Sequence, residues 1–253
     1  LYFATGEEAS RGWPLNRYAM TLFSGIAYLP GVAGTQFLAA ITLGIWWASL
    51  NWVLSNLVKI KSLGIPKSLI FLSSGIILYY TLYISTDRFQ ILYWRSGVIP
   101  YSFSIIFGLI MLGILTNQML GKNASINIYL VAVAGFIGGG LSEIGCTFLL
   151  SGITLLLIVA WWQKLLGKKW ARKSYLTIQI AWLTVLISLV LLAISPANSR
   201  YTTMQDSPNS PWMVPIYSVK SALLFIFYSL KNLPIPHLVL FILFVSLFIL
   251  EKG

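Results

Sequence analysis

Long apolar runs separated by short polar segments dominate the chain. The runs cover residues 36–58, 68–84, 101–116, 126–139, 146–162, 175–194, 212–230 and 238–250. A membrane-spanning helix needs about 20 consecutive, mostly apolar residues. The pattern therefore predicts an all-α, polytopic transmembrane helical bundle of about eight spans. A shorter apolar stretch, residues 17–30, begins with Arg17 and Tyr18 and ends at Pro30-Gly31. We expect it to form an interfacial helix that lies along the membrane surface.

Composition supports the membrane prediction. Hydrophobic residues make up 58% of the 253 residues and charged residues 9%, whereas a soluble domain carries about 25% charged residues. The single cysteine, Cys146, excludes an intrachain disulfide, and the single histidine, His237, argues against a histidine-based metal site. We expect one transmembrane domain, with residues 1–35 as an extracytoplasmic loop and interfacial helix and residues 36–253 as the bundle. Since the chain begins at Leu1, we also expect it to be a fragment that lacks the first helix.

The loops divide into two groups by their charged residues, and each group is expected on one side of the membrane. The loops at 59–67, 118–125, 164–173 and 231–236 contain lysine and arginine but no acid, so the positive-inside rule places them in the cytoplasm. The net charge of +11 then indicates contact with anionic lipid rather than nucleic acid. The opposite face receives five acids and five arginines: Glu7, Glu8, Asp87, Glu143, Asp206, Arg11, Arg17, Arg88, Arg95 and Arg200. These residues form either ordinary salt bridges at the rim or a site that binds phosphate and hydroxyl groups.

Glu143 is the only acid between Asp87 and Asp206, and it follows Gly138-Gly139-Gly140-Leu141-Ser142. A carboxylate near a membrane boundary is costly unless it meets water, a cation or a substrate. We expect a helix end that opens into a polar cavity containing Glu143, with glycines that allow tight turning and close backbone approach. The alternative is that Glu143 lies at headgroup depth in a glycine-rich turn.

Two further segments on the same face carry candidate binding residues. Tyr93, Trp94 and Tyr101 surround Arg95; they form either an interfacial aromatic belt or the wall of a sugar or lipid groove, with Arg95 near phosphate. In residues 194–201, Pro196 ends a helix, and Asn198 and Arg200 follow it. Asn198 suits hydroxyl recognition and Arg200 suits phosphate, although a solvated turn explains them equally. The chain has no GxxxxGK[ST], HExxH or GxSxG motif, so nothing supports a nucleotide-driven pump or a zinc protease.

Four short motifs, in this order, resemble a known family. They are Trp13-Pro14-Leu15-Asn16-Arg17-Tyr18, then Tyr93-Trp94-Arg95-Ser96-Gly97 with Tyr101, then Gly139-Gly140-Leu141-Ser142-Glu143, and finally Ser195-Pro196-Ala197-Asn198-Ser199-Arg200. The set resembles a family of uncharacterised bacterial multi-pass membrane proteins. That family is similar to the GT-C membrane glycosyltransferases, which take sugars from polyprenyl-phosphate carriers. The resemblance covers roughly residues 1–205. It departs from the family at Ala197, where glycine is often found.

The resemblance implies a GT-C-like bundle in the bacterial inner (cytoplasmic) membrane with its active site on the extracytoplasmic face. It implies a catalytic acid in the first external loop, which is either Glu7 or Glu8 or an acid upstream of Leu1. Glu143, outside that loop, is the other catalytic candidate, as a general base. It also implies substrate contacts from Arg200, Asn198, Arg95, Tyr93, Trp94, Tyr101 and Arg17. The expected partners are the lipid bilayer, a polyprenyl-phosphate-linked sugar, and a glycan, lipid or protein acceptor. Some GT-C enzymes use a divalent metal such as Mg²⁺ or Mn²⁺; Glu7 and Glu8 could bind one through oxygen, and the cofactor stays open.

Two other functions remain open from the sequence. A transporter or flippase of a lipid-linked or anionic solute would use the same arginines and acids for binding. Repeated, glycine- or proline-broken helices would favour it, and the sequence contains one such break, at residues 138–145. A non-catalytic membrane scaffold would use the charged face as a protein contact.

Overall fold

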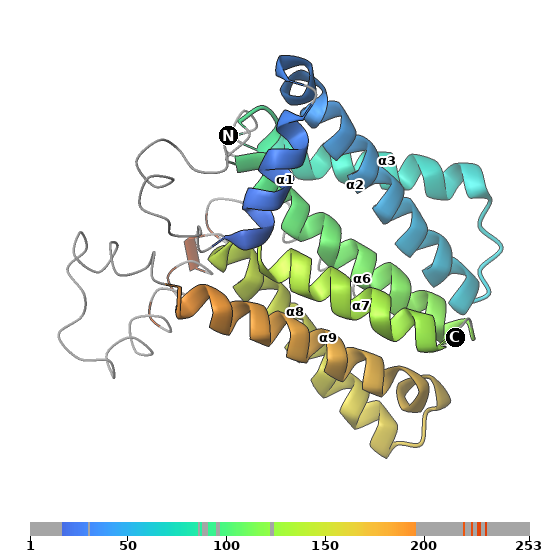
Figure 1. The fold of residues 1–253 in the computed structure, drawn as a ribbon. Helices are drawn as coiled ribbons and strands as arrows, with labels where there is room; N and C mark the ends of the chain where they lie inside the picture. The colour runs from blue at the N-terminus through green and yellow to red at the C-terminus, as the bar shows by residue number, and fades with distance from the viewer. Residues whose placement is uncertain are drawn as a thin grey trace. The chain divides into compact units, whose positions relative to one another are not determined.

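The computed structural model describes residues 17–29, 31–85, 87, 91–94, 97–121 and 124–195, with Lys220, Leu224, Phe227, Tyr228 and Lys231 beyond them. The chain divides into two compact units, Leu1–Ser199 and Arg200–Gly253. In the second unit, the five described residues are all helical. The helices described below belong to the first unit and are drawn in Figure 1.

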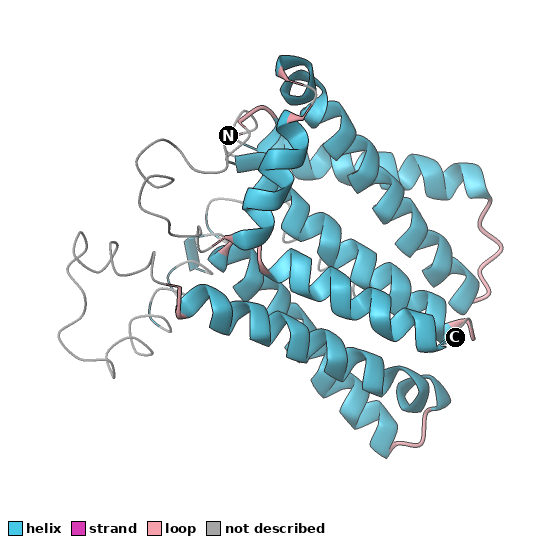
Figure 2. Ribbon diagram, in the orientation of Figure 1, coloured by secondary structure: helices cyan, strands magenta, loops and turns pink. Residues whose placement is uncertain are grey.

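Every regular element in the described part of the chain is helical (Figure 2), which confirms the all-α prediction. In chain order the elements are α1 (Tyr18–Tyr28), α2 (Val32–Ile60), α3 (Lys67–Ile84), the π-helix η2 (Val98–Ser102), α6 (Phe103–Met119), α7 (Ala124–Gly139), α8 (Glu143–Leu165) and α9 (Lys169–Ala193). The predicted interfacial helix corresponds to α1. Its 11 residues extend about 16 Å at 1.5 Å per residue, roughly half the thickness of the hydrocarbon core.

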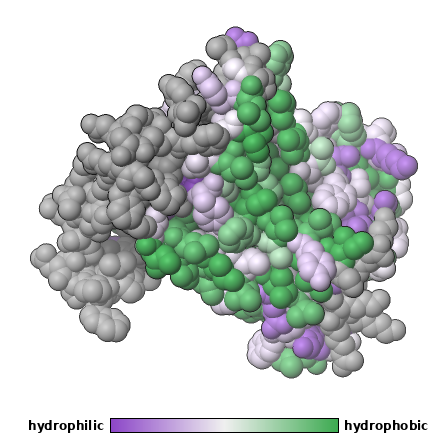
Figure 3. Space-filling model, viewed as in Figure 1, coloured by the Kyte–Doolittle hydropathy of each residue, from purple (hydrophilic) through white to green (hydrophobic). Residues whose placement is uncertain are grey.

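In the part of the chain that the structure describes, five helical segments are long and apolar enough to cross a membrane: Gln36–Ile60, Lys67–Ile84, Val98–Met119, Glu143–Leu165 and Ser174–Ala193. The segment Ile126–Gly139 is apolar but shorter. Hydrophobic side chains cover the visible face of the helices, while hydrophilic ones gather toward their ends (Figure 3). So large an exposed apolar surface is incompatible with water, and the protein is a multi-pass membrane protein. The predicted spans at 212–230 and 238–250 fall almost wholly outside the described residues, so the number eight stays a prediction.

Two clusters of buried side chains hold the bundle together. The larger one joins α6, α7, α8 and α9 through residues such as Met111, Val131, Ala181 and Val185. The smaller one gathers α1, α2, η2 and the α7–α8 turn around Trp46, Ile99 and Leu141. Inside the bundle, the side-chain amide of Asn56 donates hydrogen bonds to the Gly113 carbonyl oxygen and to Thr116 Oγ1, both at 3.1 Å. Lipid tails offer no hydrogen-bond partners, so such bonds between helices satisfy polar groups that would otherwise be unpaired.

The connections between helices fall at two opposite ends of the first unit (Figure 1). One end carries the α2–α3, α6–α7 and α8–α9 connections and is called here the lysine end, after its described lysines Lys59, Lys61, Lys67, Lys164 and Lys168. The other end carries α1, η2 and the α7–α8 turn, and is called here the Glu143 end. The sequence predicted this separation of charge.

Two predicted loops are shorter than expected. The basic loop expected at 164–173 reduces to three residues, because α8 continues to Leu165 and α9 begins at Lys169; lysine and arginine are good helix formers. The loop expected to run to Pro100 ends earlier, since η2 begins at Val98 and leads directly into α6. Val98, Ile99 and Pro100 are all buried. Proline is tolerated in the first turn of a helix because its missing N–H would have no partner there.

Candidate functional site

An ion pair joins two residues that are 126 positions apart in the chain. Arg17 precedes α1 directly, and Glu143 is the first residue of α8. Arg17 Nε and Nη2 each lie 2.9 Å from the same oxygen, Glu143 Oε2. The two side chains retain 32% and 37% of their exposure, so water and solutes reach the pair. Two of the predicted site residues therefore meet at the Glu143 end.

The neighbouring residues of α1 dock onto the end of α7. The Ala19 N–H donates a hydrogen bond of 3.1 Å to the Gly140 carbonyl oxygen. The Tyr18 hydroxyl lies 2.7 Å from the Phe136 carbonyl oxygen and 2.9 Å from Ser188 Oγ, so its single proton can be donated to either. Burial raises the pKa of Tyr18, and the hydroxyl therefore stays protonated, and a donor, at neutral pH. These contacts hold Arg17 beside Glu143.

The glycines at this site allow close packing, and the short turn between α7 and α8 at Gly140 forms without a positive φ. Gly138 and Gly139 belong to α7, and the glycines with positive φ in the described chain are Gly31, Gly121 and Gly167. A Cβ atom added at Gly140 would overlap the Tyr18 ring. One added at Gly139 would come within 2.6 Å of Ser188 Cβ. The absence of side chains lets α1 and α9 approach the α7 terminus.

Ser142 fixes the start of α8. It is the N-cap residue, and its Oγ accepts a hydrogen bond of 2.9 Å from the Gly145 N–H, satisfying a donor that the helix leaves unpaired. The same hydroxyl donates to the Pro100 carbonyl oxygen in η2 at 3.2 Å. Glu143 then occupies the first helical position, where the helix dipole favours a negative charge. Ser142 was not among the predicted site residues, although a serine before an acid at the start of an apolar run is a cap signal.

Aromatic side chains lie at the same end of the bundle as the ion pair. The element η2 contacts both α1 and α8, and its residue Tyr101 is 37% exposed. Tyr93 and Trp94, just before η2, are more exposed, at 68% and 48%. The Trp94 carbonyl oxygen accepts hydrogen bonds of 2.8 Å from the Gly97 and Val98 N–H groups, which ties this segment to η2. Both roles, an interfacial belt and a groove wall, remain compatible with these positions.

The other predicted site residues, Glu7, Glu8, Arg95, Asn198 and Arg200, lie outside the described residues, and their roles stay predictions. Within the described ranges, no group of three or more His, Cys, Asp or Glu side chains is arranged to hold a metal ion. The pair Glu7 and Glu8, which the resemblance suggested for a metal, falls in the part that is not described.

No protein-family model, curated protein or solved structure matches this chain. The likeness to GT-C enzymes therefore rests on the four short motifs alone.

The geometry at the Glu143 end permits two kinds of role. A half-exposed carboxylate held by a guanidinium can accept a proton or bind a hydroxyl group, and the guanidinium can bind a phosphate. The same pair can also act only as a clamp that holds α1 against α8. An exposed ion pair contributes about 0–1 kcal/mol to stability, so a clamp would depend more on Tyr18 and Ala19 than on the charges.

Proposed function

We propose that the protein is a membrane glycosyltransferase that transfers a sugar from a polyprenyl-phosphate carrier to an acceptor on the extracytoplasmic face. The observation that carries the proposal is the solvent-accessible Arg17–Glu143 pair, which lies at the end of the first unit opposite the lysine end. It brings together two of the four motifs on which the family resemblance rests.

The proposed reaction gives each group one task. Glu143 accepts the proton of an acceptor hydroxyl, whose oxygen attacks the anomeric carbon of the sugar. The bond between that carbon and the carrier phosphate breaks, and polyprenyl phosphate leaves with the bonding electrons. Arginine stabilises the negative charge that develops on the phosphate. Arg200 is the first candidate for this role by the resemblance, and Arg17 is a second, already placed beside Glu143.

Two features support placing the reaction at this end. The positive-inside rule assigns the lysine end to the cytoplasm, which leaves the Glu143 end on the extracytoplasmic side. In addition, Tyr93, Trp94 and Tyr101 present exposed rings at this end, and aromatic rings of this kind suit the faces of sugars and the interface with lipid. A lipid-linked donor would reach the site sideways, from the bilayer.

The test is a transfer assay on the purified full-length protein, reconstituted with synthetic polyprenyl-phosphate sugars and candidate acceptors. We expect sugar transfer by the wild type and a loss of about 10²–10⁴-fold in Glu143→Ala, the usual contribution of a general base. Arg200→Ala should also lose transfer. Asp87→Ala is the matched control, because Asp87 is an exposed acid beyond the end of α3 that is not assigned to the site.

Full transfer by both Glu143→Ala and Arg200→Ala, at normal folded yield, would remove these residues from the reaction. Movement of the lipid-linked sugar across sealed vesicles without any transfer would instead favour a flippase, the other function that uses the same residues.

A further inference from the structure

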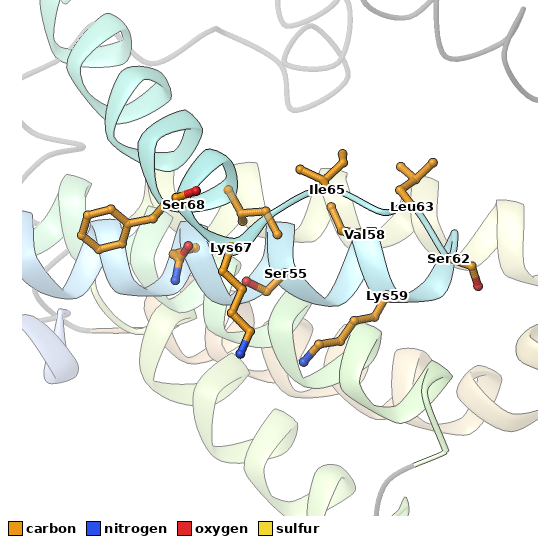
Figure 4. Close-up of a pocket in the computed structure, with 11 residues that line it drawn as sticks. Ser55, Val58, Lys59, Ser62, Leu63, Ile65, Lys67 and Ser68 are labelled. Carbon is orange, nitrogen blue, oxygen red and sulfur yellow. The ribbon is translucent and has the colours of Figure 1, made fainter.

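A groove of about 710 Å³ lies at the lysine end, between the last turns of α2 and the first turns of α3. Figure 4 shows the residues that line it. Lys59, Ser55 and Asn51 come from α2, and Lys67 and Ser68 come from α3; apolar walls are formed by residues such as Val58 and Ile70. The groove therefore combines two cations, hydroxyl groups and an apolar surface at the ends of two candidate membrane spans.

The two lysines lack a counter-charge within the described part of the chain. Their side chains extend toward the same side of the groove (Figure 4). The described acids, Asp87 and Glu143, follow the C-terminus of α3 and begin α8, so both lie at the Glu143 end. Two ammonium groups drawn from different helices and facing one space repel each other, and an anion bound between them would remove that repulsion.

A second, smaller groove of about 220 Å³ continues along the same α2–α3 seam toward the middle of the two helices. Phe71 lines both grooves. The second is lined by apolar and aromatic residues that include Trp47, Gly75 and Ile76. Gly75 has no side chain to fill it, and α3 is poorly covered by protein, with 17% of its apolar window buried. The seam therefore opens to lipid along its length.

We propose that this seam binds one anionic phospholipid. The headgroup phosphate lies between Lys59 and Lys67, with a hydroxyl donor from Ser55, and an acyl chain lies along Phe71 and Ile76. Basic pockets between membrane helices on the cytoplasmic side are typical sites for anionic headgroups. This site is separate from the Glu143 end and does not depend on the proposed glycosyltransferase activity.

The test measures lipid adducts on the purified full-length protein by native mass spectrometry, with phosphatidylglycerol and phosphatidylcholine of the same acyl chains. We expect tighter binding of phosphatidylglycerol. Lys59→Gln with Lys67→Gln should weaken that binding about fivefold for each lysine removed. Lys164→Gln with Lys168→Gln is the matched control, since it removes the same charge from the same end but outside the groove. The control should bind as the wild type does.

A second variant tests the contact with the acyl chain separately from the contact with the headgroup. Gly75→Leu keeps both lysines and places a side chain in the apolar groove, where a helix accepts leucine readily. We expect it to weaken phosphatidylglycerol binding severalfold. Lys59→Arg with Lys67→Arg should keep the binding, and thermal unfolding should show that all variants are folded.

Three results would overturn the proposal. The first is equal loss in the two double lysine variants, which would mean general attraction to a basic end. The second is no preference for phosphatidylglycerol over phosphatidylcholine in the wild type. The third is competition by inorganic phosphate as effective as that by the intact lipid, with no effect of Gly75→Leu, which would assign the groove to a soluble anion.

Discussion

At the scale of single residues, the contact between Gly140 and Tyr18 decides whether α1 can dock. The Tyr18 ring occupies the space where a side chain at position 140 would begin. Its hydroxyl then reaches Phe136 and Ser188 on α7 and α9. Any larger residue at position 140 would force the Tyr18 side chain to move from this position.

We therefore expect Gly140→Ala to destabilise the protein by about 1–3 kcal/mol, the usual cost of overpacking. Gly152→Ala is the control, because a Cβ atom at this position in α8 meets nothing within 4 Å. In a helix interior, that change should stabilise by about 0.5–1 kcal/mol. Unfolding of both variants in the same detergent measures the difference. Equal effects of the two substitutions would mean that Tyr18 does not pack against Gly140.

The sequence identified Glu143 and Arg17 as candidate site residues but did not pair them. Glu143 was a candidate because it is an isolated acid between apolar runs. Its partner could not be predicted, because five arginines and five acids on one face allow many pairings. The role of Tyr18 was also missed, since a tyrosine next to an arginine at a membrane boundary is typical of a simple interfacial anchor.

At the scale of helices, the apolar runs predicted most boundaries well. The span expected at 68–84 matches α3, Lys67–Ile84, almost residue for residue. Lipid tails and protein interiors are both apolar, however, so hydropathy does not reveal which side of a helix faces protein. The share of each apolar window that is buried ranges from 17% in α3 to 56% in the segment Val98–Met119. That difference comes from packing, which only the structure reveals.

The π-helix was the element least accessible to prediction. Pro100 and the polar residues before it indicated a loop that ends at Pro100. In the structure, Val98 to Ser102 form a π-helical turn that is continuous with α6 and buried except at Tyr101. Hydrogen bonds from Ser102 to the Ile91 carbonyl oxygen, and from Ser142 to the Pro100 carbonyl oxygen, hold it in place. These hydrogen bonds depend on the tertiary fold, so the local sequence pattern does not predict them. π-Helical turns are frequent at functional sites, in keeping with the position of η2 beside the Glu143 end.

At the scale of the whole molecule, an extracytoplasmic reaction at the Glu143 end requires that the two ends of the first unit face opposite sides of the membrane. We expect a cysteine placed at Tyr93 to react with a membrane-impermeant maleimide on intact cells. A cysteine placed at Lys168 should react only after the membrane is permeabilised. Both positions are exposed, and the native Cys146 is buried, so its background reaction should be low. The reverse pattern would place the Glu143 end in the cytoplasm and exclude an extracytoplasmic reaction there.

We propose that Glu143 takes part in the reaction rather than only holding α1 in place. Exchanging the two charged residues separates these roles. An ion pair that only holds α1 in place works in either orientation, whereas a general base must present its carboxylate at position 143. Arg17→Glu and Glu143→Arg should each lower the unfolding temperature. Together they should restore most of the lost stability, although an arginine at the start of α8 opposes the helix dipole.

The most direct measurement is the rate of sugar transfer by this doubly exchanged protein, taken together with its unfolding temperature. If Glu143 is the general base, the unfolding temperature should recover and the transfer rate should stay about 10²–10⁴-fold below that of the wild type. Recovery of transfer in step with stability would contradict this role, and would leave the Arg17–Glu143 pair as a structural contact between α1 and α8.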